Sequence, residues 1–207
     1  MTSRRVLILF AIVGASAVVA CRARAEEAVA TDSPAATIAS LQKGLLAARD
    51  KPNATVQDRY RALEPVIVKT HNLPYIAEFA LRRQWPMLSA EERERYSAAF
   101  QRLSVMTYAA RFGNVARDAF RPIEAGAPDA NGRVQVKTAI KREGQPDVTL
   151  EYLLQRDDED WRIINIVADG VSDLALKRAE YQRVFAAGGI AGLIAELEQQ
   201  TQRLERG

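Results

Sequence analysis

Very few residues of this chain could do chemistry. His71 is the only histidine and Cys21 the only cysteine, so the chain cannot build a multi-histidine metal site or an internal disulfide. A Ser-His-Asp arrangement would have to use His71, but no nucleophile motif such as G-x-S-x-G accompanies it. We therefore interpret His71 as a local cap or a surface side chain beside the helix start at residues 72–74.

The acidic residues add little to this inventory. Their densest run, residues 157–160, lacks the alternating ligands and the turn glycine of a calcium loop, so a solvated hairpin tip explains it. Asp169 and Asp173 flank an expected strand-to-helix corner and could serve acid–base work, although the helix dipole alone accounts for an acid at position 173. We expect no catalytic residue, no metal site and no cofactor other than a bound cargo, and hence no enzymatic activity.

The first 25 residues are typical of a secretory signal peptide. Two arginines precede an uncharged stretch, residues 6–20, that is shorter than the roughly 20 apolar residues needed to span a bilayer. An Ala-x-Ala sequence at 23–25 supplies a cleavage site, which predicts a mature chain that begins at Glu26. The alternative is a lipoprotein, because residues 18–21 loosely resemble a lipobox in which Cys21 is acylated and tethers the chain to a membrane.

Removal of residues 1–25 would change the charge balance. The chain has 29 basic and 26 acidic residues, and four of the basic ones lie in the signal, so residues 26–207 carry 25 basic and 26 acidic side chains, a net charge of −1. No basic excess remains for binding nucleic acid. Without a cysteine, residues 26–207 must be stabilised by a packed core, and their length fits a single domain.

The first half of this domain has helical periodicity. Apolar residues repeat at helical spacing after a start at Ser33, and again in a second helix that Pro65 should kink or split. A third helix is expected to begin at residues 72–74. Ser89 and Glu92 form a capping box ahead of a long fourth helix.

The second half changes to the period of two that strands show. Alternation over residues 134–140 and 148–154 predicts two half-buried strands joined by a short turn. Residues 161–168 are apolar on both faces, so this strand should be covered on both sides. Residues 120–124 could add a short edge strand. The short turns make the expected sheet antiparallel.

Helix returns at Ser172, and the pair Gly188-Gly189 should divide it into two C-terminal helices. Helices followed by strands, rather than alternating with them, indicate the α+β class. Aromatic residues gather in the helices and in one strand. Periodicity does not separate a filled core from one that encloses an apolar cavity, and both interpretations stay open at this point.

Four groups of residues carry a family resemblance: 72–85 (NLPYIAEFALRRQW) with 88–93 and Phe100, 108–112 (YAARF), 161–172 (WRIINIVADGVS) with Arg178 and Tyr181, and 188–197 (GGIAGLIAEL). In order and spacing they resemble the MlaC-type family, also called the toluene-tolerance family, over most of residues 36–200. The stretch 169–178 is more similar to the hopanoid-associated branch, the HpnM type. Asn165 and Lys177-Arg178 depart from the pattern of the phospholipid branch.

The resemblance implies a fold and a function. The fold would be α+β, with N-terminal helices packed on a curved antiparallel sheet, like the cone of nuclear-transport-factor proteins, and two C-terminal helices around an apolar pocket. The function would be that of a periplasmic carrier that binds a phospholipid or a hopanoid. Its partners would be an outer-membrane lipid complex and an inner-membrane ABC transporter with an MCE-domain subunit, between which it would shuttle the lipid.

Two other functions remain as alternatives. One is a non-enzymatic adaptor with a filled core that scaffolds a hopanoid or lipid transport system. The other is a small-molecule-binding domain on a similar cone, which would need polar groups that converge in the pocket.

Strand alternation and helical stripes predict which side chains would line a cavity. The expected lipid-binding residues are Phe79, Phe100, Tyr108, Val136, Thr138, Ile140, Leu150, Tyr152, Tyr181 and Phe185. Docking to partners should use a polar rim around the mouth of the pocket. The expected rim residues are Arg82, Arg83, Lys177 and Arg178.

Overall fold

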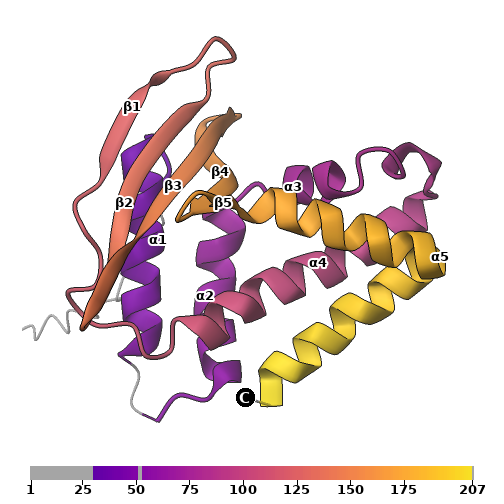
Figure 1. The fold of residues 1–207 in the computed structure, drawn as a ribbon, viewed down its shortest axis with the longest axis horizontal. Coiled ribbons are helices and arrows are strands. Elements are labelled where there is room, and N and C mark those ends of the chain that lie inside the picture. Colours follow the sequence, from indigo (N-terminus) through magenta and orange to yellow (C-terminus); the bar gives the residue numbers. More distant parts are fainter. Residues whose placement is uncertain (1–29, 51–52, 207) are drawn as a thin grey trace, which may run out of the picture.

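The computed structural model describes residues 30–50 and 53–206 (Figure 1). The expected signal peptide, its cleavage site and Cys21 lie outside these residues. The helices of the first half are α1 (Pro34–Arg49), α2 (Val56–Thr70), α3 (Leu73–Ala80), the short 3₁₀ helix η1 (Trp85–Met87) and α4 (Ala90–Arg111). The second half consists of β1 (Glu124–Pro128), β2 (Val134–Arg142), β3 (Gln145–Asp157), β4 (Asp160–Ala168), β5 (Val171–Ser172) and α5 (Asp173–Arg206).

The helix starts follow the capping residues of the sequence. The Ser33 hydroxyl accepts a hydrogen bond from the N–H of Ala36, and Ser89 and Glu92 form both bonds of the capping box that begins α4. The expected split of the second helix at Pro65 is wrong, because α2 runs through this residue without interruption. Pro65 lies on the exposed side of the helix, where water can replace the hydrogen bond that a proline cannot donate.

The strands form one open antiparallel sheet in the order β1-β2-β3-β4-β5. Gly144 and Asp158 have positive φ angles of 68° and 53° in the two tight hairpin turns, a conformation that Gly and Asp tolerate. The edge strand begins later than expected, at Glu124, and Phe120 contributes only an isolated bridge to Ile140. No residue of β4 is exposed, so both of its faces are covered, as the sequence predicts.

The last helix consists of two segments. Gly189, with φ 63° and ψ −163°, interrupts α5, and the chain turns back there (Figure 1). The second segment returns along α4, where Arg102 donates to Glu205 at 2.8 Å. The predicted break at Gly188-Gly189 and the α+β class are therefore confirmed.

One face of the sheet packs on the N-terminal helices. Thr37 on α1 donates to the carbonyl oxygen of Trp161 at 2.8 Å, and Gln42 donates to the hydroxyl of Thr138 at 3.5 Å. Val136 and Tyr152 are cross-strand partners on this face and are buried. The opposite face is therefore the one that α1 leaves free. No helix among the described residues is long and apolar enough to cross a membrane.

Candidate functional site

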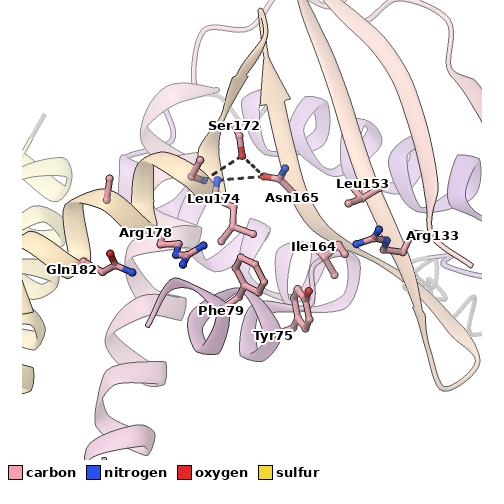
Figure 2. Close-up of a pocket in the computed structure, with 12 residues that line it drawn as sticks. Tyr75, Phe79, Arg133, Leu153, Ile164, Asn165, Ser172, Leu174, Arg178 and Gln182 are labelled. Atoms are coloured by element: carbon pink, nitrogen blue, oxygen red, sulfur yellow. Dashed lines mark hydrogen bonds between the residues drawn. The ribbon is translucent and has the colours of Figure 1, made fainter. Parts of the chain in front are cut away.

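A pocket of about 560 Å³ lies where α3 and the first turns of α5 meet the sheet (Figure 2). Its volume is within the range of small-molecule sites in proteins. The residues that line it come from both helices and from the β2–β5 region: Tyr75, Phe79, Arg133, Leu153, Ile164, Asn165, Ser172, Leu174, Ala175, Arg178, Ala179 and Gln182.

The floor of the pocket is apolar, and α3 supplies its aromatic part. Tyr75 and Phe79 are one turn apart and stack at 5.8 Å between ring centroids. The position of α3 is fixed at its start, because the side chain of Asn72 caps the helix and its backbone N–H donates to the carbonyl oxygen of Ile163 at 2.9 Å. This bond joins the helix to β4, so the two aromatic rings are held against the sheet.

A β-bulge directs a second side chain of β4 toward the pocket. Leu153 pairs with Asn165, but the next residue, Leu154, pairs with Ile163. Ile164 is therefore the extra residue of the bulge, and it lines the pocket together with Asn165. Ile163 and Ile164 point to opposite faces by ordinary strand alternation, and both are buried, at 0% and 3% exposure.

Hydrogen bonds hold the start of α5 as the wall of the pocket. The side-chain oxygen of Asn165 accepts from the hydroxyl of Ser172 at 3.1 Å and from the N–H of Leu174 at 3.3 Å (Figure 2). The Ser172 hydroxyl also accepts from the N–H of Ala175 at 3.2 Å and thereby caps the helix that the sequence predicts to begin here. The wall is thus tied to β4 by side chains that also face the hollow.

The only charged residues in the lining are two arginines. Arg133 is paired with Asp129 at 2.9 Å. The Arg178 guanidinium lies 5.8 Å from the centroid of the Phe79 ring, and Arg82 lies 5.6 Å from the same centroid. Figure 2 shows Arg133 and Arg178 at opposite ends of the apolar floor.

Of the expected lipid-binding residues, the pocket contains Phe79. Val136, Thr138, Leu150 and Tyr152 lie on the other face of the sheet and are buried there. Their contact with a lipid, like that of the half-buried Ile140 on β2, stays a prediction.

The remaining four expected residues lie on α4 and α5. Phe100 and Tyr181 meet edge to face at 6.3 Å in the interface between these helices. Tyr108 stacks on Phe112 at 5.6 Å, and Phe185 packs half-buried against the core. None of the four lines the pocket described here.

The expected rim residues occupy different environments. Arg178 lines the pocket and Arg82 lies beside it, over Phe79. Arg83 is exposed. Lys177 donates to both carboxylate oxygens of Asp173 at 2.6 Å, so its charge is compensated within α5.

Several lining residues were not identified from the sequence. Ile164 lies in the run 161–168, which is apolar on both faces and predicted two covered faces for this strand. That run was the available signal for a second apolar surface. Leu153 lies on the face of β3 that also carries Thr149 and Glu151, and the half-buried strand predicted there gave no signal for it. Leu174 and Gln182 belong to an amphipathic helix, and nothing local distinguishes them from ordinary interface residues.

His71 is the C-cap residue of α2, in agreement with the expected local cap, but it is buried at 3% exposure, so the alternative of a surface residue is wrong. It follows the last residue of α2, and its ring nitrogens lie 3.0 Å from the Thr70 hydroxyl and 2.9 Å from the Tyr108 hydroxyl. Burial lowers the pKa of His71 to about 4, which makes it neutral at pH 7. Across residues 30–50 and 53–206, no group of three His, Cys, Asp or Glu side chains could hold a metal ion.

Comparison with protein-family models decides the affiliation. The model of the MlaC protein family matches residues 12–199, which is most of the chain. The chain belongs to the MlaC family. The match includes α3, the sheet and most of α5, and hence every element that lines the pocket.

Solved structures confirm the fold of this MlaC family member. A phospholipid-binding protein of Ralstonia solanacearum, solved in complex with a phospholipid, superposes with a TM-score of 0.70. The match covers 84% of this chain and 99% of the other, at 20% sequence identity, and therefore supports the common α+β architecture. A search of curated protein sequences finds no significant match.

Proposed function

We propose that this MlaC family member is a periplasmic carrier that binds a phospholipid or a hopanoid and moves it between the outer and inner membranes. The observation that carries the proposal is the pocket between α3, α5 and the sheet, with an apolar floor and an open side. The phospholipid-bound neighbour from Ralstonia solanacearum, which has the same fold, supports a lipid as the cargo.

The physical reason for a carrier is the cost of exposing acyl chains to water. Each buried CH₂ group recovers about 0.8 kcal/mol, so a long chain does not leave a membrane and cross an aqueous space at a useful rate. Tyr75, Phe79, Leu153 and Ile164 offer an apolar surface that replaces the membrane for part of such a chain. The role requires binding and release but no bond making, which agrees with the expectation of a non-enzymatic protein.

The location and the partners follow from the same proposal. Residues 1–25 have the composition of an export signal, which supports delivery to the periplasm, either as a free protein or tethered through Cys21. The donor and acceptor would be the outer-membrane complex and the MCE-domain ABC transporter expected for the family. Arg83, which is exposed and lies outside the pocket, is available for such docking.

Native mass spectrometry of the protein purified from bacterial periplasm tests the proposal. A carrier retains a co-purifying lipid, whose mass identifies it as a phospholipid or a hopanoid. A protein that remains free of lipid after incubation with vesicles of both lipid types would contradict the proposal and favour the adaptor. The measured N-terminus also distinguishes cleavage before Glu26 from acylation of Cys21.

A further inference from the structure

Two positively charged side chains converge on one aromatic ring of the pocket. The guanidinium carbons of Arg178 and Arg82 lie 5.8 and 5.6 Å from the centroid of Phe79. Neither arginine forms an ion pair with a carboxylate of the described residues. A phenyl ring attracts a cation through its quadrupole but does not neutralise it, so two like charges remain uncompensated at this end of the pocket.

The neighbouring cations, unlike Arg178 and Arg82, are paired with carboxylates. Arg133, at the other end of the pocket, is paired with Asp129 through both Nε and Nη2 at 2.9 Å. Lys177, next to Arg178 in the chain, is bound by Asp173. None of the twelve lining residues is an aspartate or a glutamate. The positive potential is therefore concentrated at the Arg178 end.

The apolar floor leads away from this end. Figure 2 shows Phe79, Tyr75 and Ile164 in a row between Arg178 and Arg133. An amphiphile with an anionic group at Arg178 would place its hydrocarbon along this row. Guanidinium groups bind phosphate oxygens through two parallel hydrogen bonds, and a phosphate bound at Arg178 would also be attracted by the nearby charge of Arg82.

We infer that Arg178 and Arg82 bind the lipid headgroup through its negative charge, so that the pocket selects lipids with a net negative headgroup over zwitterionic lipids. This inference rests on the proposed function and assigns specificity within it. A choline or ethanolamine headgroup adds an ammonium group. The pocket lining has no carboxylate to pair with this ammonium, and Arg82 would repel it. A headgroup such as phosphatidylglycerol carries the phosphate charge without this ammonium.

Loading of the lipid-free protein from vesicles tests the selectivity. Three probes share palmitoyl and oleoyl chains: phosphatidylglycerol, phosphatidylcholine and diacylglycerol. We expect phosphatidylglycerol to bind about tenfold more tightly than phosphatidylcholine, the size of one charge-assisted hydrogen bond. Arg178→Gln, alone and with Arg82→Gln, should bring phosphatidylglycerol to the level of phosphatidylcholine and should lower diacylglycerol binding by a smaller factor than phosphatidylglycerol binding.

Two variants serve as controls. Arg183→Gln removes an exposed arginine of the same helix that does not line the pocket, and it should keep the wild-type preference. Arg178→Lys keeps the charge but not the planar fork, and it should retain part of the preference. Circular dichroism verifies that each variant is folded.

The outcomes separate this inference from the proposed function. Equal loading of phosphatidylglycerol and phosphatidylcholine by the wild type would overturn the inference while the carrier function stands, and so would a preference that survives in the double variant. If none of the three lipids loads, the carrier function fails and the inference with it. Titration with inorganic phosphate tests whether the arginines bind free phosphate instead of a lipid headgroup. Micromolar binding that Arg178→Gln abolishes would assign the arginines to free phosphate and overturn the headgroup role.

Discussion

The imidazole Nε2 of His71 lies 2.9 Å from the hydroxyl oxygen of Tyr108, and the two rings meet at an angle of 66°. This contact joins the end of α2 to the last turns of α4 inside the core. Burial disfavours the charged imidazole and lowers its pKa to about 4. Asp173 opposes this shift and Lys177 adds to it, and both effects are smaller than that of burial.

This geometry predicts how stability depends on pH. The pKa of His71 is lower in the folded protein than in the unfolded chain, where it is near 6.5, so the unfolded state binds more protons between these two values. The contribution of His71 is therefore complete above pH 6.5 and is lost as the pH falls to about 4, by roughly 3 kcal/mol in total. Urea unfolding between pH 4 and 7 measures it.

The comparison with His71→Gln isolates this residue from the carboxylates that titrate near the same pH. Glutamine stays neutral, so the variant is less stable at pH 7 but should lose less free energy of unfolding on acidification than the wild type. If the free energy of unfolding changed with pH in the same way in the two proteins, His71 would not be held neutral by the core.

Leu150 and Leu153 provide a second test, because they lie on opposite faces of β3. Leu150 is 7% exposed and packs in the core, so Leu150→Ala should lower the free energy of unfolding by about 2–5 kcal/mol. Leu153 is half-buried and lines the pocket, and its truncation enlarges an existing hollow. Leu153→Ala should cost only about 1–2 kcal/mol but should weaken lipid loading. Denaturant unfolding and vesicle loading of both variants measure this contrast, and a larger loading defect in Leu150→Ala would place the lipid on the other face.

The features that the sequence predicted correctly are those set by residues close together in the chain. The capping box at Ser89 and Glu92 and the break at Gly189 follow from local backbone chemistry. The alternation in β3 correctly placed Leu150 and Tyr152 on one face of the strand. It could not tell which apolar face encloses a hollow, because that depends on where α3 and α5 dock, far away in the chain.

Two further features were not readable for related reasons. The bulge at Ile164 occurs within the sequence Ile163-Ile164, without the glycine that often marks such a site. Arg178 was expected to contact partner proteins, and only the position of Phe79 on another helix shows that it lies in the pocket.

Gly189 predicts a sharp difference between two adjacent substitutions. Its φ and ψ of 63° and −163° are accessible almost only to glycine, whereas Gly188 is helical. A Cβ atom at either position meets no other atom within 4 Å, so steric contact does not distinguish them. Gly189→Ala should cost about 1–3 kcal/mol of unfolding free energy, and Gly188→Ala should gain up to about 1 kcal/mol. Thermal unfolding of the two variants tests this, and equal melting temperatures would contradict the turn at Gly189.

The pocket itself is tested by filling it. Ala179 lies on α5, is exposed and lines the pocket, so an indole introduced there can occupy the hollow without displacing packed side chains. Ala179→Trp should leave the free energy of unfolding within about 1 kcal/mol of the wild type and should reduce lipid loading severalfold. Ala186→Trp is the matched control, because Ala186 is exposed on the same helix outside the pocket.

Thr138→Trp places the same ring in the core, where Thr138 is 8% exposed and donates to the carbonyl oxygen of Arg121. Overpacking of this kind should lower the free energy of unfolding by about 1–3 kcal/mol. A folded Thr138→Trp variant that no longer loads lipid, together with normal loading by Ala179→Trp, would move the binding site to the opposite face of the sheet.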